Sequence, residues 1–323
     1  MIRIGILGAA RVTEYALIAP AAERKDVEIV AVASRNADRA RTYADKHGIA
    51  DVGADYAALI ARADIDLIYN ALPPSRHADL SIAALEAGKH VLCEKPFAMN
   101  ADQARAMVKA AEASGRHLIE AFHYRFHPAF AYLLGLLNEG AIGDPVSVDG
   151  LFSVPIPANP GELRHDPKLG GGALMDLGCY PAHWLRTVVG EEPRVTKAEA
   201  VLSETGVDLS LAADLAFPSG VTGSLACSMA MDCSFAARLS VEGTAGRIDF
   251  TNPLAPHMGH EIRIATDSGE RTESIDGQST YWHQLDHVVE VVTGSADPQT
   301  VGTDATANMA LIDALYDAAG VTR

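Results

Sequence analysis

The first third of the chain alternates short, largely apolar segments with helical ones, and this alternation constrains the fold more than any other feature. Helical segments lie at residues 36–47 before Gly48, 75–87 with Ser75 as the cap, and 100–114 before Gly115. Strands that are apolar on both faces belong to a parallel sheet covered by helices. Right-handed crossovers then predict a doubly wound α/β domain. The predicted strands are residues 2–7, 27–33, 66–71, 90–92 and 117–121.

The pattern changes from about residue 123. A helix at 128–138, a strand at 145–152, a Pro/Gly-rich loop at 154–172 and a helix at 173–189 are expected. In residues 208–217 the odd positions are mostly large and apolar, and the even positions, Asp208 included, are small or polar. Residues 221–229 repeat this pattern, which is typical of antiparallel strands with one buried face. Helices at 280–292 and 304–319 close the chain.

These patterns predict an α/β protein with two domains. Residues 1–122 form the N-terminal doubly wound parallel-sheet domain, with the C-terminal helix 304–319 as a candidate to pack back on it. Residues 123–303 form a C-terminal α+β domain with an open, mostly antiparallel sheet for substrate binding and oligomerisation. A chain of 323 residues exceeds the size of one typical core, which favours this division.

Charge and composition exclude several classes of partner. The formal net charge is -16, and such a surface repels phosphate backbones and anionic lipids, so neither nucleic acid nor membrane is expected as a partner. No apolar run approaches the roughly 20 residues of a spanning helix. The four cysteines include no C-x-x-C pair, which favours reduced thiols and a cytoplasmic location.

The first strand is followed by a turn that can bind a dinucleotide. A backbone that cradles pyrophosphate usually reads G-x-G-x-x-G, because N–H groups and a helix N-terminus must approach the phosphates. Here the turn keeps Gly8 but has Ala10 and Thr13 at the other two glycine positions. An ordinary glycine turn is the alternative. The Gly8 turn lies between a strand and a helix, and this position favours the cofactor site, with Gly8, Ala10, Arg11 and Val12 as its residues.

The end of the second strand indicates which cofactor binds. An acidic residue there would suit the 2′-hydroxyl of NAD, and an arginine suits the 2′-phosphate of NADP. The sequence has Ser34-Arg35-Asn36, so Ser34 and Arg35 predict NADP, with NAD as the other option. A solvated residue at a helix start is the alternative for Arg35.

Two further segments follow strand ends, where ligands bind in this fold. They contain Asn70, Leu72, Pro73 and His77, then Glu94-Lys95-Pro96. A lysine at this edge beside a rigid proline can be aimed into the cleft, although a generic Lys-Pro pair is usually a surface turn.

Three glycines precede a helix that carries polar side chains. Gly170-Gly171-Gly172 leads into Asp176, Tyr180 and His183, whose spacing places them on one helix face opposite an apolar one. A carboxylate, a phenol and an imidazole together are candidate proton-transfer groups. For His183, a buried and satisfied side chain is the alternative.

No metal site is predicted. His283 and His287 are four residues apart on a helix, and His257 and His260 lie in a loop, but the glutamate of a zinc-protease motif is missing. There is no G-x-S-x-G elbow and no Cys–His–Asn pattern, so nucleophilic catalysis is not predicted.

Together these motifs resemble the glucose-fructose oxidoreductase / inositol dehydrogenase family (Gfo/Idh/MocA). The resemblance runs from Gly8 through Glu94-Lys95-Pro96, residues 120–128 (EAFHYRFHP) and residues 170–180 to the last helix. It implies an N-terminal Rossmann domain and a C-terminal open-sheet domain. Lys95 matches the family's active-site lysine and Asp176 its helix aspartate. Arg164 resembles the arginine of a Trp-Arg pair that contacts the cofactor, but Leu163 replaces the tryptophan.

Tyr180 stands where inositol dehydrogenases carry a histidine. This resembles the branch with glucose-fructose oxidoreductase, dihydrodiol dehydrogenase and NADP-linked D-xylose dehydrogenase. The implied function is an NAD(P)-dependent oxidoreductase that moves a hydride between nicotinamide and a carbinol or carbonyl carbon of a sugar, polyol or dihydrodiol. A non-catalytic dinucleotide-binding regulatory protein of the same fold is the alternative.

In this reading Tyr180 is the general acid/base and Lys95 its electrostatic partner, and the reverse assignment stays open. Asp176 holds a substrate hydroxyl or orients Lys95, and His183 completes the predicted substrate set. The short side chains on the outer face of residues 210–228 predict a homodimer or homotetramer joined through the C-terminal sheet.

Overall fold

The computed structural model describes residues 1–322, which divide into two compact units. The first unit comprises Met1–His123 and Tyr281–Thr306, and the second comprises Tyr124–Thr280 and the chain from Ala307 onward. The polypeptide therefore passes between the units three times. Helix α10 (Thr303–Ala318) begins in the first unit and lies mostly in the second.

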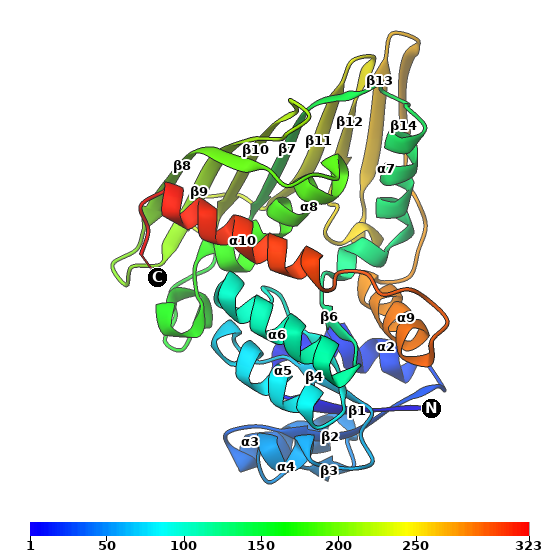
Figure 1. Cartoon of the computed structure of the whole chain (residues 1–323), viewed down its shortest axis with the longest axis vertical. Helices are drawn as coiled ribbons and strands as arrows, with labels where there is room; N and C mark the ends of the chain where they lie inside the picture. Colours follow the sequence, from blue (N-terminus) through cyan, green and yellow to red (C-terminus); the bar gives the residue numbers. More distant parts are fainter. Residues whose placement is uncertain (323) are drawn as a thin grey trace. The chain divides into compact units, whose positions relative to one another are not determined.

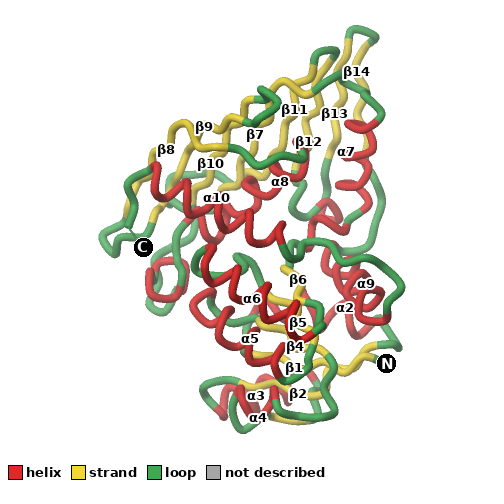
Figure 2. Tube along the Cα trace, in the orientation of Figure 1, coloured by secondary structure: helices red, strands yellow, loops and turns green. Residues whose placement is uncertain are grey.

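The first unit is built on a six-stranded parallel sheet, as predicted. Its strand order is β3-β2-β1-β4-β5-β6, the doubly wound order in which the winding direction reverses between β1 and β4. Ligands bind at the carboxyl ends of the strands beside this switch point. Figure 2 shows these strands between helices. They are β1 (Ile2–Leu7), β2 (Val27–Ala33), β3 (Asp51–Val52), β4 (Leu67–Asn70), β5 (His90–Cys93) and β6 (Leu118–Glu120).

Helices cover both faces of this sheet. Ile4 and Ile6 pack with Leu17, Tyr43 and Val288, so the helical segment after β1, α3 and α9 share one face. Helices α5 and α6 pack together beside β4 and β5 (Figure 1). The elements are α1 (Arg11–Thr13), the π-helix η1 (Glu14–Ile18), α2 (Ala19–Ala22), α3 (Ala37–His47), α4 (Tyr56–Ile60), η2 (Pro74–Arg76), α5 (His77–Glu86), α6 (Ala101–Ser114) and α9 (Thr280–Thr293). The short helix η3 (His123–Phe126) leads into the second unit.

Most predicted helix ends are confirmed by their caps. Asn36 and Asn100 cap α3 and α6, and Gly48 and Gly115 end them in the left-handed conformation. The prediction that Ser75 caps a helix is wrong. Pro74 begins a short 3-10 turn, and α5 starts only at His77 behind Arg76, which makes no side-chain cap.

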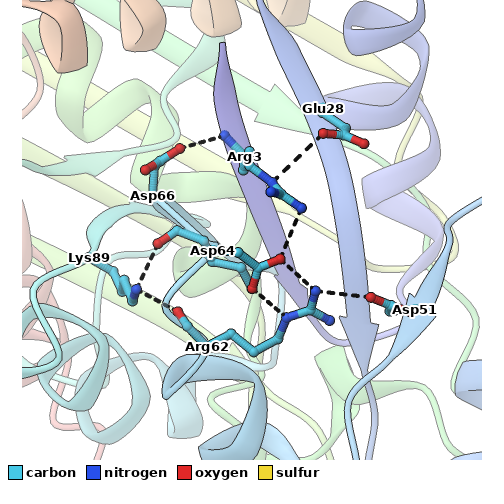
Figure 3. A network of polar contacts seen from close by, with 8 residues as sticks. Arg3, Glu28, Asp51, Arg62, Asp64, Asp66 and Lys89 are labelled. Atoms are coloured by element: carbon cyan, nitrogen blue, oxygen red, sulfur yellow. Dashed lines mark hydrogen bonds and ion pairs between the residues drawn. The ribbon is translucent and has the colours of Figure 1, made fainter.

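A polar network lies at the amino ends of the strands of this sheet, opposite their carboxyl ends (Figure 3). Arg62 pairs with Asp64 at 2.8 Å and with Asp51 at 2.9 Å, and Arg3 also reaches Asp64 at 2.9 Å. The Lys89 ammonium donates to the carbonyl oxygens of Arg62 and Ile65 at 2.6 and 2.7 Å. This network fastens the starts of neighbouring strands.

The second unit contains an open eight-stranded sheet in the order β14-β13-β12-β11-β7-β10-β9-β8. Among the strands of this sheet in residues 1–322, only β7 and β10 pair in parallel, so the predicted mostly antiparallel sheet is confirmed. The strands are β7 (Pro145–Ser153), β8 (Arg194–Leu202), β9 (Asp208–Ala216), β10 (Thr222–Ser228), β11 (Ala236–Gly243), β12 (Gly246–Thr251), β13 (Glu261–Thr266) and β14 (Gly269–Glu273). Figure 1 shows α8 and α10 along this sheet. The remaining elements are α7 (Pro128–Asn138), η4 (Leu163–His165), η5 (Pro167–Leu169), the π-helix η6 (Leu174–Gly178), α8 (Cys179–Val189) and η7 (Pro256–Met258).

The predicted alternation in β9 holds with one exception. Leu211, Ala213 and Leu215 are buried, and Ala212 is exposed. Asp208 was grouped with the outward polar positions, and that assignment is wrong, because the side chain is only 1% exposed.

The outer face of the sheet is more charged than the β9 and β10 segments suggested. Register places Lys197, Asp214, Ser224, Asp149, Ser240, Asp249 and Arg263 in one row across seven strands. Ser224 donates to Asp149, and Ser240 donates to Asp249 at 2.6 Å. Lys197, Asp249 and Arg263 come from strands that the sequence analysis did not resolve. None of the helices in residues 1–322 has the length and apolar character of a bilayer-spanning helix.

Candidate active site

The turn after β1 depends on its glycine. Gly8 has φ +102°, and a Cβ there would lie 3.0 Å from Leu72 and 3.3 Å from the Ala71 carbonyl oxygen, so glycine is needed. The following helical segment begins at Arg11, which is exposed, behind Ala10, whose side chain caps no N–H group. Val12 is half-buried. Free N–H groups at a helix start fit the pyrophosphate of a dinucleotide.

Helix α3 fastens this turn. The Arg39 guanidinium donates to the Ala9 carbonyl oxygen at 2.8 Å, and the Tyr43 hydroxyl donates to the Ala10 carbonyl oxygen at 3.0 Å. The Asn36 side chain accepts from the Arg39 N–H, so it serves as the helix cap. Ser34 is half-buried and Arg35 exposed at the end of β2. Sequence reasoning missed Arg39 and Tyr43, because no local pattern marks bonds that reach 30 residues back.

Asn70 and His77 shape the loops at the switch point. The Asn70 amide donates to Ser81 Oγ at 3.1 Å and to the His77 carbonyl oxygen at 3.3 Å. The His77 ring is fully buried, with Nδ1 2.9 Å from the Pro96 carbonyl oxygen and Nε2 2.7 Å from that of Leu72. Burial lowers the pKa of His77. Both side chains thus hold the backbone around Pro73 and Pro96, and their direct contact with a cofactor stays a prediction.

A buried phenol–carboxylate pair precedes Lys95. The Tyr69 hydroxyl donates to Glu94 Oε1 at 2.5 Å, and the Lys95 N–H donates to Glu94 Oε2 at 3.3 Å. Burial, reinforced by the charge of Glu94, raises the pKa of Tyr69 well above its usual value, so the phenol remains a donor. Glu94 is therefore held at the carboxyl end of β5, directly before the half-buried Lys95. The sequence analysis did not single out Tyr69.

Close packing explains why glycines occupy the positions before η6. A Cβ on Gly171 would lie 2.5 Å from the Arg164 carbonyl oxygen. Gly172 has φ +125°, and a Cβ there would lie 2.1 Å from Asp208 Oδ1 and 2.8 Å from the Tyr316 hydroxyl. Any larger residue would displace these groups.

Three residues hold the start of the helical segment that carries Asp176 and Tyr180. Asp208 Oδ2 accepts from the Leu174 N–H at 2.7 Å, and Asp208 Oδ1 accepts from the Tyr316 hydroxyl at 2.7 Å. We call Leu174, Asp208 and Tyr316 the Asp208 clamp. A carboxylate is favoured at a helix start, and π-helical turns such as η6 are frequent at functional sites. The clamp joins β9, η6 and α10.

Asp176 is paired with a cation. The Arg164 Nε donates to Asp176 Oδ2 at 2.6 Å, and Nη1 donates to Glu162 Oε1 at 3.0 Å. The charge of Asp176 is the main cause that raises the pKa of Arg164. The structure thus brings Arg164, predicted as a cofactor contact, together with Asp176, predicted as a substrate contact.

Tyr180 lies in an aromatic setting and is only 4% exposed. Its ring centroid is 5.7 Å from that of Phe152, 6.1 Å from Tyr124 and 6.3 Å from Trp184. The Asn308 amide of α10 donates to the Cys179 carbonyl oxygen at 3.3 Å, which supports the turn beside Tyr180.

His183 is also buried, and its Nδ1 is hydrogen-bonded to the Tyr124 hydroxyl. This contact favours the satisfied, structural reading of His183. The predicted separation of a functional and an apolar helix face is wrong, because nine of the eleven residues of α8 are buried and Tyr124 also contacts Trp184.

Three of the four histidines considered for a metal site accept hydrogen bonds from the backbone. His287 Nε2 accepts from the Gln299 N–H at 3.2 Å, and His260 Nε2 accepts from the Ile275 N–H at 3.0 Å. His257 Nδ1 accepts from the Thr280 N–H at 3.3 Å. Among residues 1–322, no three His, Cys, Asp or Glu side chains are grouped to hold a metal ion.

A glycine cradle at the switch point of a doubly wound sheet, joined to a second unit that carries Asp176 and Tyr180 on a buried helix, defines a dinucleotide-binding oxidoreductase. Residues 2–122 match the oxidoreductase family with an NAD-binding Rossmann fold, and residues 130–249 match the GFO/IDH/MocA C-terminal domain. The chain belongs to the Gfo/Idh/MocA family, which confirms the predicted family and fold class.

The curated relatives include dehydrogenases and reductases. The chain is 34% identical over 318 residues to D-xylose 1-dehydrogenase (NADP(+)) 2 of Haloferax volcanii, covering 98% of this chain and 96% of that enzyme. It is 40% identical over 184 residues to trans-1,2-dihydrobenzene-1,2-diol dehydrogenase of Xenopus laevis, covering 57% of this chain and 55% of that enzyme.

A solved structure shares the whole architecture. The 3-ketoreductase of Actinomadura kijaniata in complex with NADP and TDP-benzene superposes with a TM-score of 0.91 at 26% identity, covering 98% of this chain and 97% of that chain. These relatives support the predicted oxidoreductase and its NADP cofactor, and they favour catalysis over the regulatory alternative.

Proposed function

We propose that this chain catalyses NADP-dependent hydride transfer at a carbinol or carbonyl carbon of a sugar, polyol or dihydrodiol. The observation that carries the proposal is the buried helix with Tyr180 and the Arg164-paired Asp176, held by the Asp208 clamp. The activities named for the relatives support this substrate range.

The first unit supplies groups suited to the cofactor. Gly8, Ala10, Arg11 and Val12 can hold the pyrophosphate, and Ser34 with Arg35 can hold the 2′-phosphate. Asn70, Leu72, Pro73, His77, Glu94 and Lys95 complete this side, and Arg164 is the proposed contribution of the second unit. Bound NADP or NADPH accepts or supplies the hydride.

The chain's own residues move the proton. Tyr180 takes the proton from a substrate hydroxyl in oxidation and returns it in reduction. A free phenol has a pKa of about 10, and a nearby ammonium lowers it, so Lys95 is the partner that makes Tyr180 effective at neutral pH. Asp176 accepts a hydrogen bond from a second substrate hydroxyl, and Arg164 keeps Asp176 oriented.

A substrate panel tests this function. Purified protein is mixed with NADP and, in turn, with aldoses, cyclic polyols and trans-dihydrodiols, and the near-ultraviolet absorbance of NADPH is followed. We expect turnover with at least one cyclic alcohol. Tight NADP binding without turnover on any panel member, in either direction, would favour the regulatory alternative.

We also propose a homodimer or homotetramer in the cytoplasm, with a domain boundary after residue 122. The two family matches support a boundary between residues 122 and 130, and four free cysteines support a reducing compartment. The outer face of the sheet offers Ala212 and Ala226 as opposed small residues. Ala212→Arg with Ala226→Arg should yield a monomer in light scattering, and a monomeric wild type would refute the proposal.

A further inference from the structure

The segment between β10 and β11 of the second unit carries exposed apolar side chains. Phe235 is 63% exposed and Met231 is 65% exposed, and both lie in residues 229–235 between β10 and β11. Exposed aromatic and sulfur-containing side chains that gather at one place usually mark a binding surface.

The sheet register places Phe235 on the same face as Tyr180. Ala237 pairs with Phe152 across β11 and β7, and both point to the buried face. Because side chains alternate along a strand, Phe235 continues that face just beyond the strand end. The ring geometry agrees, since the Phe152 centroid is 6.5 Å from Phe235 and 5.7 Å from Tyr180. Phe152 therefore connects the exposed ring to the proposed acid/base residue.

The backbone around these side chains is well fastened. The Ser153 hydroxyl donates to the Ser234 carbonyl oxygen at 2.6 Å, and the Cys233 N–H donates to the Ala230 carbonyl oxygen at 3.1 Å. The Val154 and Ile156 N–H groups donate to the carbonyl oxygens of Ser228 and Met229 at 2.9 and 3.0 Å, so two half-buried aliphatic side chains join the same edge. We call Phe235, Met231, Val154 and Ile156 the apolar rim.

Charge limits what the apolar rim can accept. Residues 229–235 read MAMDCSF, with one exposed acid, Asp232, and no lysine or arginine. Residues 229–235 offer no cationic partner to a phosphorylated or carboxylated substrate group, and Asp232 would repel such a group. An uncharged ring that presents carbon and hydrogen to Phe235 gains contact with an aromatic face and loses no hydrogen bond.

We propose that the apolar rim is a substrate subsite for the carbon-rich part of an uncharged cyclic alcohol, such as the unsubstituted ring carbons of a dihydrodiol. The inference rests on the proposed function, because it makes Tyr180 the residue at the reacting oxygen. It narrows the substrate class to rings that carry hydroxyl groups on only some of their carbons, in preference to sugars that carry them on most carbons.

The test compares two substrates in three variants. Phe235→Ala should lower kcat/KM for trans-1,2-dihydrobenzene-1,2-diol about three- to tenfold through KM, the size of one aromatic contact. The value for D-xylose should stay within about twofold, since a fully hydroxylated ring gains less from the contact. Phe235→Tyr should keep kcat/KM for the diol near the wild-type value. Met258 is another exposed apolar residue of this unit, at 78% exposure, and Met258→Ala should change kcat/KM for neither substrate.

A binding measurement separates this inference from the function. Ligand-detected NMR with the diol and NADP-loaded protein reports the subsite without turnover. Weaker binding in Phe235→Ala supports the apolar rim even if no substrate turns over, in which case the proposed function fails alone. Three results would overturn the inference. They are unchanged diol binding and kinetics in Phe235→Ala, an equal loss of kcat/KM for both substrates, and no diol binding to the wild type.

Discussion

The two units prepare their functional groups in different ways. In the first unit, a ligand would meet mainly backbone, at the Gly8 turn and the loops that Asn70 and His77 hold. In the second unit, the groups are side chains on a buried helix, and residues far away in sequence support them, such as Asp208 and Tyr316. Cofactor binding should therefore tolerate changes at Tyr180 and in the Asp208 clamp, and chemistry should not.

The largest effect is expected from removal of the proposed proton-transfer pair. Lys95→Ala and Tyr180→Phe should each lower kcat about 10²–10⁴-fold, the usual contribution of a general acid/base. The double variant should lose less than the product of both effects, because the two groups act as a unit. Steady-state kinetics check this, with Lys25→Ala and Tyr132→Phe as matched surface controls. A normal rate in Tyr180→Phe would mean that Lys95, and not Tyr180, is the proton-transfer residue.

A smaller effect is expected at the 2′-phosphate. Arg35→Asp should reverse the preference for NADP over NAD, since a charge-assisted pair contributes about 1.5–3 kcal/mol. The measurement is kcat/KM for each cofactor. Arg41→Asp makes the same charge change on the exposed side of α3 and should keep the preference. If both variants shift it equally, Arg35 acts only through net charge.

The Asp208 clamp should have a moderate effect on chemistry and stability together. Tyr316→Phe leaves a buried carboxylate short of one donor, which costs about 1–3 kcal/mol of unfolding free energy. We expect kcat to fall about tenfold with NADP affinity intact, since small displacements of positioned groups are costly. Urea unfolding and kinetics measure both. In Tyr132→Phe, whose hydroxyl donates to Glu273 nearer the surface, both quantities should change little. Lost stability with unchanged kcat would make the clamp purely structural.

The smallest effect concerns the network of Figure 3 and acid stability. Hydrogen bonding with Arg62 lowers the pKa of Asp64 from 3.8 to about 2. A carboxyl with a depressed folded-state pKa stabilises the fold above its unfolded pKa, and this stabilisation is lost as pH falls from 3.8 to about 2. Asp64→Asn should flatten the acid-unfolding curve in that window. Asp267→Asn, in an exposed turn, should leave the curve unchanged, and an unchanged curve in Asp64→Asn would contradict the account.

The same contrast explains what the sequence could reveal. Strands, helix caps and the Gly8 turn depend on residues that are neighbours in the sequence, so they could be predicted. The predictions included Asn36 and Gly48 at the two ends of α3. Tyr69, Arg39 and Asp208 act through contacts with residues 25 to 108 positions away in the chain. Asp208 even had the polarity of a surface position, and only its bonds to Leu174 and Tyr316 explain its burial. The π-turn of η6 left no sequence signal that we recognised.

The division of labour between the units can be tested with one crossed experiment. NADP affinity by calorimetry and the single-turnover rate at saturating NADP are measured in wild type, Arg35→Asp and Tyr180→Phe. The account predicts that Arg35→Asp weakens NADP binding about tenfold or more and leaves the saturated rate nearly unchanged. Tyr180→Phe should keep the affinity and lose about 10²-fold or more of the rate. If Tyr180→Phe weakens NADP binding as much as Arg35→Asp does, or keeps the wild-type rate, the central claim is contradicted.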